Sequence, residues 1–193
     1  MAVPLKVIRE ARACTACAAS LPLGPRPLVA GSSAARILIV GQAPGRRAHE
    51  SGIPWHDPSG DRLRAWLGID DDTFYDPRTT ALMPMGFCFP GTGASGDLPP
   101  RPECAPLWHD RLSAAFRSVR LTVLVGRYAI DAKVSPRFRT VTDAVRAWNE
   151  LLPERIALPH PSGRNNIWLK KNPWFERETL PALRRAVTRA IDA

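Results

Sequence analysis

Four short apolar runs recur along the chain, and each one predicts a buried β-strand. The runs are brief, mainly aliphatic, and followed directly by Gly or Pro. They occupy residues 36–40 (RILIV), 80–83 (TALM), 121–125 (LTVLV) and 155–158 (RIAL). Because their apolar residues are continuous rather than alternating, we expect strands that are covered on both faces, as in a parallel sheet.

Apolar residues spaced three and four apart predict helices between these strands. The helical patterns cover residues 60–67, 103–119, 142–152 and 176–191. Strands that alternate with helices are typical of a three-layer α/β/α sandwich, here with a central four-stranded parallel sheet. With 193 residues and 45% hydrophobic content, the chain suits a single domain over residues 1–193. Residues 84–106 are rich in Gly and Pro, and we expect them to form one long ordered loop.

Polar segments follow three of the predicted strands. They are residues 41–45 (GQAPG), 84–88 (PMGFC) and 159–166 (PHPSGRNN). In a parallel sheet the ligand-binding and catalytic residues lie just past the carboxyl ends of the strands. The three segments are therefore predicted to converge at one edge of the sheet.

The charge of the chain narrows the choice of partner. The formal net charge is +9. A protein this basic most often binds a polyanion, and nucleic acid is the commonest one. A chain from a generically basic proteome would have a similar net charge without binding nucleic acid. Between residues 164 and 175 basic side chains alternate with aromatic ones, which can neutralise phosphates and stack on bases. For Trp174, packing of the last helix against the core is a better explanation than stacking on a base.

No apolar stretch approaches the ~18 residues that a membrane span requires. The first residues also lack the apolar run of a signal peptide. We therefore expect a protein without membrane contact, located in the cytoplasm and associated with the nucleoid.

The chain has four cysteines, which form two spaced pairs. They are Cys14, Cys17, Cys88 and Cys104. Each could be a buried small hydrophobe, but the pairing favours a metal site that the fold gathers. Disulfides are not expected in a chain without an export signal. Zinc and an iron–sulfur cluster both accept four thiolates, and spacing alone does not separate them.

The segments at the strand ends resemble motifs of the uracil-DNA glycosylase superfamily, most closely its iron–sulfur families four and five. Residues 41–45 are similar to the first motif, G-E-A-P-G or G-L-A-P-A. Residues 52–55 (GIPW) stand where family four has G-R-P-F, and residues 57–61 (DPSGD) resemble the D-x-S-G-D stretch of family five. Residues 160–162 (HPS) match the second motif, and residues 164–166 (RNN) are similar to its tail.

The resemblance extends from Cys14 to about Trp174. The separation of Cys88 and Cys104 is that of the last two cluster cysteines of family four. Each motif alone is a weak signal, but all of them in this order and at these spacings are specific. The resemblance implies a [4Fe–4S] cluster on the four cysteines, with zinc as the alternative.

The resemblance also implies a role for each site residue. Trp55 would stack on the base, unless it is ordinary core, and His160 would donate a hydrogen bond to the uracil oxygen. Asp57 would activate water or stabilise the sugar cation, although an Asp before residues 60–67 could equally be a helix N-cap. His49, oriented by Glu50, is the alternative base. Gln42 would belong to the catalytic group with Asp57, His160 and His49. The remaining substrate-binding residues would be Gly41, Ala43, Pro44, Gly45 and Met85, and the DNA-binding residues Ser162, Gly163, Arg164, Asn165 and Asn166.

Arg164 stands where the family inserts a side chain into the duplex. Two positions depart from the family pattern. Gln42 replaces the glutamate that helps to position water in family four; a Gln amide cannot act as a base but can orient water or a base edge. Pro84 replaces the asparagine that reads the uracil edge, which family five also lacks.

These residues predict a monofunctional DNA repair glycosylase that excises uracil with water as the nucleophile and acts as a monomer on DNA. Its motifs hold no lysine for Schiff-base chemistry. The main alternative is a non-catalytic module that binds damaged DNA and keeps the fold. A weaker alternative is a zinc-stabilised nucleic-acid-binding protein.

Overall fold

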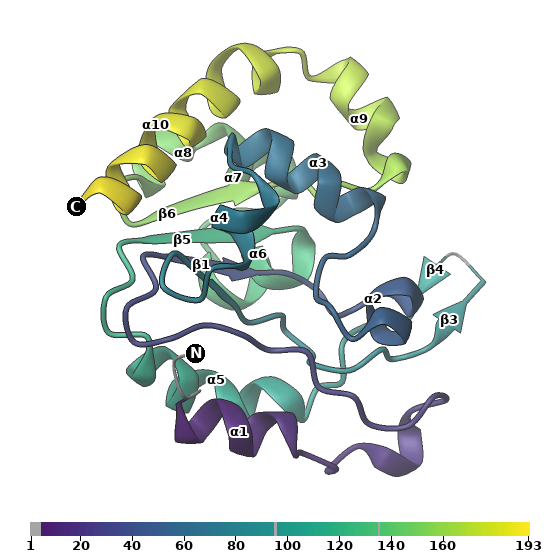
Figure 1. Cartoon of the computed structure of the whole chain (residues 1–193). Coiled ribbons are helices and arrows are strands. Elements are labelled where there is room, and N and C mark those ends of the chain that lie inside the picture. Colours follow the sequence, from purple (N-terminus) through teal and green to yellow (C-terminus); the bar gives the residue numbers. More distant parts are fainter. Residues whose placement is uncertain (1–4, 95, 135) are drawn as a thin grey trace.

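Four parallel strands form the central sheet in the order β2-β1-β5-β6. The computed structural model describes residues 5–94, 96–134 and 136–193 (Figure 1). The strands are β1 (Ile37–Val40), β2 (Thr80–Leu82), β5 (Leu121–Val125) and β6 (Arg155–Leu158). Strand β1 lies in the middle, with Ile37 paired to Thr80 on one side and to Leu121 on the other. The predicted four-stranded parallel sheet is confirmed.

Helices cover both faces of this sheet. On one face α10 (Leu180–Asp192) packs against α3 (Pro58–Leu67) and against β1 and β5. Helices α1 (Lys6–Arg12) and α5 (Cys104–Ala115) pack on each other at the opposite side of the molecule (Figure 1). The strands are buried almost throughout, because apolar side chains on both of their faces meet helices. The α/β fold with flanking helices is therefore as predicted.

Two of the predicted helices are interrupted. Residues 142–152 divide into α7 (Val141–Arg146) and α8 (Trp148–Leu151). The C-terminal helix begins with a π-helical turn, η3 (Phe175–Thr179), before α10. Pro181 lies in the first turn of α10 and has no N–H to donate to the preceding turn, so the wider turn comes just before it. The predicted helix 103–119 ends earlier, at Ala115.

Several short elements were not expected from the apolar pattern. They are α2 (Arg46–Ser51), α4 (Asp71–Tyr75), α6 (Arg127–Val134), α9 (Asn166–Lys171), the 3-10 turns η1 (Ala18–Ser20) and η2 (Gly163–Asn165), and a hairpin of β3 (Thr92–Gly93) and β4 (Gly96–Asp97). The hairpin interrupts the segment that was expected to be one long loop. Elements of one or two turns carry too few apolar positions for a periodic pattern.

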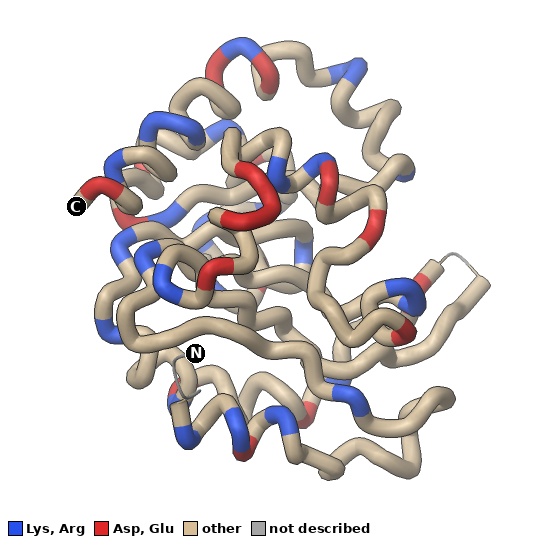
Figure 2. The backbone as a smooth tube through the Cα atoms, in the orientation of Figure 1, with Lys and Arg blue, Asp and Glu red and all other residues tan. Residues whose placement is uncertain are grey.

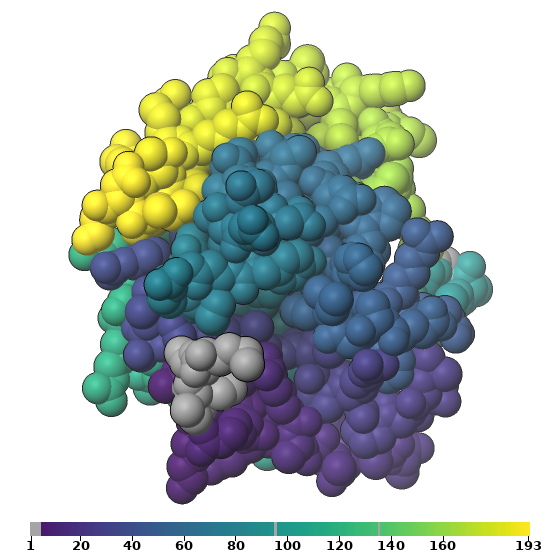
Figure 3. All heavy atoms as spheres, viewed as in Figure 1, coloured from purple at the N-terminus to yellow at the C-terminus, as the bar shows by residue number. Residues whose placement is uncertain are grey.

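Charge is unevenly distributed along the fold. Acidic residues gather on the segment of α3 and α4, whereas basic residues recur along α9, α10 and α1 (Figure 2). In the space-filling view, α3 and α4 lie between the C-terminal helix and the N-terminal segment (Figure 3). None of the helices in the described ranges is long and apolar enough to cross a membrane.

Candidate active site and cysteine pocket

A cleft of about 440 Å³ lies at the carboxyl ends of the strands. The three polar segments that were predicted to converge all contribute to it, together with the start of α3 and Asp97 at the end of β4. Its lining is Gly41, Gln42, Ala43, Pro44, Gly45, Ala48, Pro54, Trp55, Asp57, Ser59, Pro84, Asp97, His160, Ser162, Arg164 and Asn165. Most of the site residues expected from the sequence are thus brought together in one cavity.

Trp55 and His160 face each other across this cleft. Their ring centroids are 6.0 Å apart and their planes differ by 29°. Trp55 is partly buried, and it has φ +60, the left-handed region that non-glycine residues rarely adopt. A Cβ on Gly41 would lie 2.7 Å from the Trp55 ring, so glycine is required there for the ring to come this close. Trp55 therefore offers an aromatic face to the cleft.

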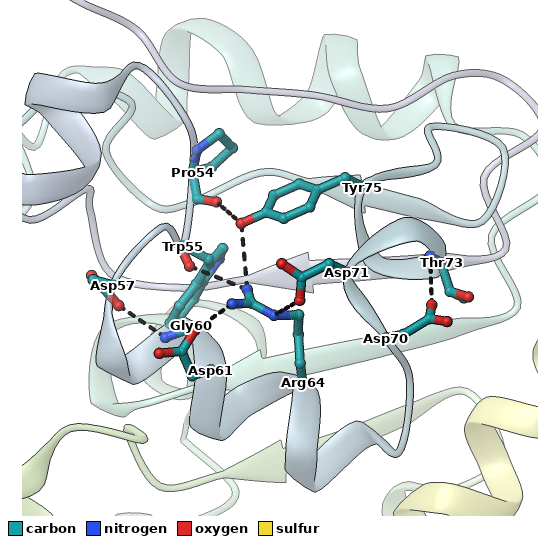
Figure 4. A network of polar contacts seen from close by, with 10 residues as sticks. All are labelled: Pro54, Trp55, Asp57, Gly60, Asp61, Arg64, Asp70, Asp71, Thr73 and Tyr75. Atoms are coloured by element: carbon teal, nitrogen blue, oxygen red, sulfur yellow. Dashed lines mark hydrogen bonds and ion pairs between the residues drawn. The ribbon is translucent and has the colours of Figure 1, made fainter.

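A buried arginine holds the loop that carries Trp55 (Figure 4). The Arg64 guanidinium donates to the Trp55 carbonyl at 3.3 Å and pairs with Asp61 at 2.6 Å and Asp71 at 2.7 Å. The Tyr75 hydroxyl donates to the Pro54 carbonyl at 3.0 Å, and burial raises the pKa of this phenol, which keeps its proton in place. These bonds satisfy carbonyls on both residues of the turn and stabilise the unusual Trp55 backbone.

The Arg64 network leads to a prediction about stability. Arg64→Met should lower the free energy of unfolding by about 2 kcal/mol, because it leaves the Trp55 carbonyl and two carboxylates without their donor. Urea unfolding of both proteins measures the difference. Arg78→Met is the matched control, since Arg78 is an exposed arginine paired with Asp76 and should change little. Equal stabilities of the Arg64 variant and the wild type would show that the network does not hold the loop.

The surroundings of His160 favour a neutral imidazole. Its Nδ1 accepts from the backbone N–H of Ser162 at 3.3 Å, so the ring proton belongs on Nε2. Burial lowers the pKa of His160, an effect that Asp57 opposes and Arg164 adds to. The side-chain amide of Asn165 donates to the His160 carbonyl at 2.7 Å and orders the same loop. His160 is therefore a neutral imidazole with an N–H available to the cleft.

Asp57 is the N-cap of α3 and also lies in the lining of the cleft. Its Oδ1 accepts from the Gly60 N–H at 2.8 Å and caps α3 (Figure 4), while the residue also lines the cleft. A Cβ on Gly60 would lie 1.7 Å from the Trp55 carbonyl oxygen, so this turn admits only glycine. The cap and the Trp55 turn are thus built together.

Several expected site residues lie outside the cleft lining. His49 is on α2 with 7% of its surface exposed, and its ring centroid is 6.1 Å from that of Phe89. Burial lowers the pKa of His49. Met85 contributes a backbone N–H to the Gly41 carbonyl at 2.9 Å, and its side chain packs against the core. Gly163 and Asn166 also lie beyond the lining, and Asn166 accepts from Arg62 at 2.9 Å.

Gln42 and Arg164 both contact the β3–β4 hairpin. The Gln42 amide donates to the Leu98 carbonyl at 3.3 Å. The Arg164 guanidinium lies where a side chain on Gly96 would be, with Nη1 only 1.7 Å from a Cβ built there. Gly96 also has φ +123, so the hairpin needs glycine for two reasons. The hairpin brings Asp97 into the cleft, a residue that the sequence did not single out.

A family comparison agrees with this arrangement. Residues 29–184 match the uracil DNA glycosylase superfamily. The chain belongs to this superfamily. Membership indicates DNA glycosylase activity on uracil-type lesions and a DNA substrate. The match is to the superfamily as a whole, so the likeness to families four and five stays a prediction.

In this glycosylase fold all four cysteines line one pocket beside the loop that precedes α5. The pocket is bounded by Cys14, Cys17, Cys88 and Cys104 and by apolar walls that include Leu21, Phe87 and Trp108. All four are free thiols, and the Phe87 N–H donates to the Cys104 sulfur at 3.3 Å. Burial raises the pKa of Cys104 to about 12, so its thiolate needs a cation beside it. Residues far apart in the chain are thus gathered as a metal site requires.

The donor set of this pocket fits an iron–sulfur core. A zinc ion needs four ligands about 2.3 Å from one centre. Within the described ranges, no three His, Cys, Asp or Glu side chains are arranged closely enough to hold a single ion. Four thiols around one pocket are donors that an iron–sulfur cluster and a zinc ion both accept, and the backbone N–H to the Cys104 sulfur is a contact of the kind that tunes a cluster.

Proposed function

We propose that this protein hydrolyses the N-glycosidic bond of uracil in DNA and leaves an abasic site. The observation that carries the proposal is the cleft in which Trp55, a neutral His160 and Asp57 face one space at the sheet edge. A base must leave the helical stack before its glycosidic bond can be reached. A cleft with an aromatic face, a hydrogen-bond donor and a carboxylate suits a flipped nucleotide.

The chemistry that this site would supply follows from the charge that develops. As the bond breaks, the sugar becomes cationic and the departing uracil becomes anionic. The Nε2–H of His160 would donate to the uracil oxygen and stabilise the anion, and a neutral imidazole does so without giving up its proton. The Asp57 carboxylate would stabilise the cation or activate water. Trp55 would stack on the base, and Gln42 would orient the hairpin through Leu98.

We further propose that the cysteine pocket holds a [4Fe–4S] cluster on Cys14, Cys17, Cys88 and Cys104, as in families four and five. The pocket that all four cysteines share and the N–H donated to the Cys104 sulfur support this proposal, with zinc as the alternative. When bound, the cluster would link the N-terminal segment to the loop that carries the hairpin. It would thus stabilise the fold around the cleft. A brown protein after aerobic purification is the expected result, and a colourless protein with stoichiometric zinc would contradict it.

One incubation tests the function. Pure protein is mixed with an oligonucleotide that contains a single uracil, and the product is treated with alkali, which breaks the strand at an abasic site. Cleavage at the uracil is expected, and none without alkali, because the proposed reaction has no lyase step. Tight binding without cleavage would favour the non-catalytic damaged-DNA module, which the uncharged Gln42 makes the second candidate. Oligonucleotides with other deaminated bases define the substrate range.

DNA affinity should depend steeply on salt. The net charge of +9 and the exposed Lys170 and Lys171 on α9 predict a slope of several units between log affinity and log salt concentration. Replacing both lysines with Ala should reduce the slope by about one to two units, one for each phosphate contact that is lost. Fluorescence anisotropy between low and physiological salt measures it. An unchanged slope would place the DNA on another face.

A further inference from the structure

A second carboxylate enters the cleft from the β3–β4 hairpin. Asp97 is the last residue of β4 and lines the same cavity as Asp57 and His160. The charges of Arg164 and Arg46 act on its carboxylate. Asp97 is an exposed residue of the hairpin, but it also lines the cleft, and an acid in that position is a candidate for chemistry rather than structure.

The two carboxylates approach each other over Gly45. The position of a Cβ on Gly45 lies 3.2 Å from Asp97 Oδ2 and 3.9 Å from Asp57 Oδ2. These two oxygens are therefore no more than about 7 Å apart, so both carboxylates can face one bound substrate. Because residue 45 is glycine, the space between them is open to the cleft.

The hairpin that carries Asp97 is held by the site itself. On one side Gln42 donates to the carbonyl of Leu98, the next residue. On the other side the Arg164 guanidinium occupies the space beside Gly96, the preceding residue. The Leu98 N–H donates to the Gly91 carbonyl at 2.8 Å and closes the turn. Asp97 is thus positioned by Gln42 of residues 41–45 and by Arg164 of residues 159–166. A catalytic group has to be held in place in this way.

The environments of the two carboxylates differ. Oδ1 of Asp57 accepts from a backbone N–H at the N-terminus of α3, which stabilises its negative charge. Burial raises the pKa of Asp97; the charge of Asp57 adds to this, and Arg164 and Arg46 oppose it. A carboxylate whose pKa is raised is the better proton acceptor, which favours Asp97 for this role.

We propose that Asp97 accepts the proton of the attacking water while Asp57 remains charged beside the sugar. In this step the bond between C1′ and the base nitrogen breaks, and its electron pair leaves with uracil. The water oxygen bonds to C1′ and one of its protons passes to the Asp97 carboxylate. Asp97 releases that proton to solvent, and uracil takes one from solvent. One water is consumed, and free uracil and an abasic sugar are formed.

This assignment rests on the proposed function, and single-turnover excision measured across pH tests the two separately. Asp97→Asn should slow excision of uracil from duplex DNA by about ten- to a hundredfold at neutral pH, with DNA affinity within about twofold. In the wild type the rate should fall as pH drops through the pKa of Asp97, which burial and the charge of Asp57 raise and which Arg164 and Arg46 lower. The Asn variant should lose this acidic limb. Asp192→Asn, an exposed change at the end of α10, is the control.

Each other outcome has a defined meaning. A wild type that does not excise uracil would overturn the proposed function. A wild type that excises, with an Asp97→Asn variant that is equally fast or keeps the acidic limb, would overturn the role of Asp97 alone. If the Asn variant does not fold, Gly45→Ala tests the same space, since its methyl group would enter the gap between the two carboxylates. A folded Gly45→Ala protein with the wild-type rate would also contradict the proposal.

Discussion

Asp57→Asn is expected to slow single-turnover excision of uracil by a hundredfold or more. The substitution removes a negative charge from the cleft but keeps the shape of the side chain, so the effect should fall on the chemical step. Asn is as good a helix cap as Asp, and α3 should therefore stay folded. Rapid quench of enzyme in excess over a uracil-containing duplex measures the rate, and anisotropy should show nearly unchanged affinity.

A matched control is available within the same network. Asp70 caps α4 through the Thr73 N–H at 2.9 Å, as Asp57 caps α3 (Figure 4), but it lies outside the cleft lining. Asp70→Asn should therefore retain the wild-type rate. The catalytic role of Asp57 would be refuted if the Asp57→Asn variant stayed near wild-type activity while His49→Ala was inactive. Asp57 would then be a helix cap alone.

Cys104→Ala should bleach the protein and lower its melting temperature by about 10 °C. Metal-binding energy is folding energy in such sites, and a few kcal/mol corresponds to a shift of this size in a chain of this length. Cys104 begins α5 and its sulfur accepts from the Phe87 N–H, so the loss also disconnects the two ends of the hairpin loop. Visible absorbance and calorimetry on the purified variant measure both effects.

The control for this experiment lies between the first two cysteines. Thr15→Ala changes the same loop without touching the four thiols, and it should keep both colour and melting temperature. Cys88→Ala should behave like Cys104→Ala, because Cys88 lines the same pocket. A cysteine variant that retains colour and stability would show that this thiol is not a ligand.

The sheet was readable from local pattern because its strands are buried on both faces. Strands β5 and β6 begin and end where the apolar runs 121–125 and 155–158 do. The C-terminal helix was harder, since its apolar spacing continues through the π-helical turn before Pro181. Periodicity reports which side chains face the core, but it does not report which backbone carbonyl each N–H reaches.

The sequence predicted those residues of the candidate site that come directly after a strand. Residues 41–45, Pro84 and His160 come together because parallel strands place their carboxyl ends at one edge. Arg64 and Asp97 gave no such signal. Arg64 reads as one more basic residue on a helix, and Asp97 as a polar residue in a Gly-rich loop. Each acquires its role from contacts with segments distant in sequence.

By itself, then, the sequence determined the layers of the fold, the polar segments at one sheet edge, and the two cysteine pairs that line one pocket. The layers and the polar segments follow from the apolar pattern of short stretches of chain. The cysteines stand out because few residue types bind metals. Only the tertiary structure decided that His49 lies outside the cleft lining, that Arg64 holds the Trp55 turn, and that Asp97 faces Asp57. Such facts depend on where loops close over the sheet, and loop closure is set by hydrogen bonds and glycine contacts between distant residues.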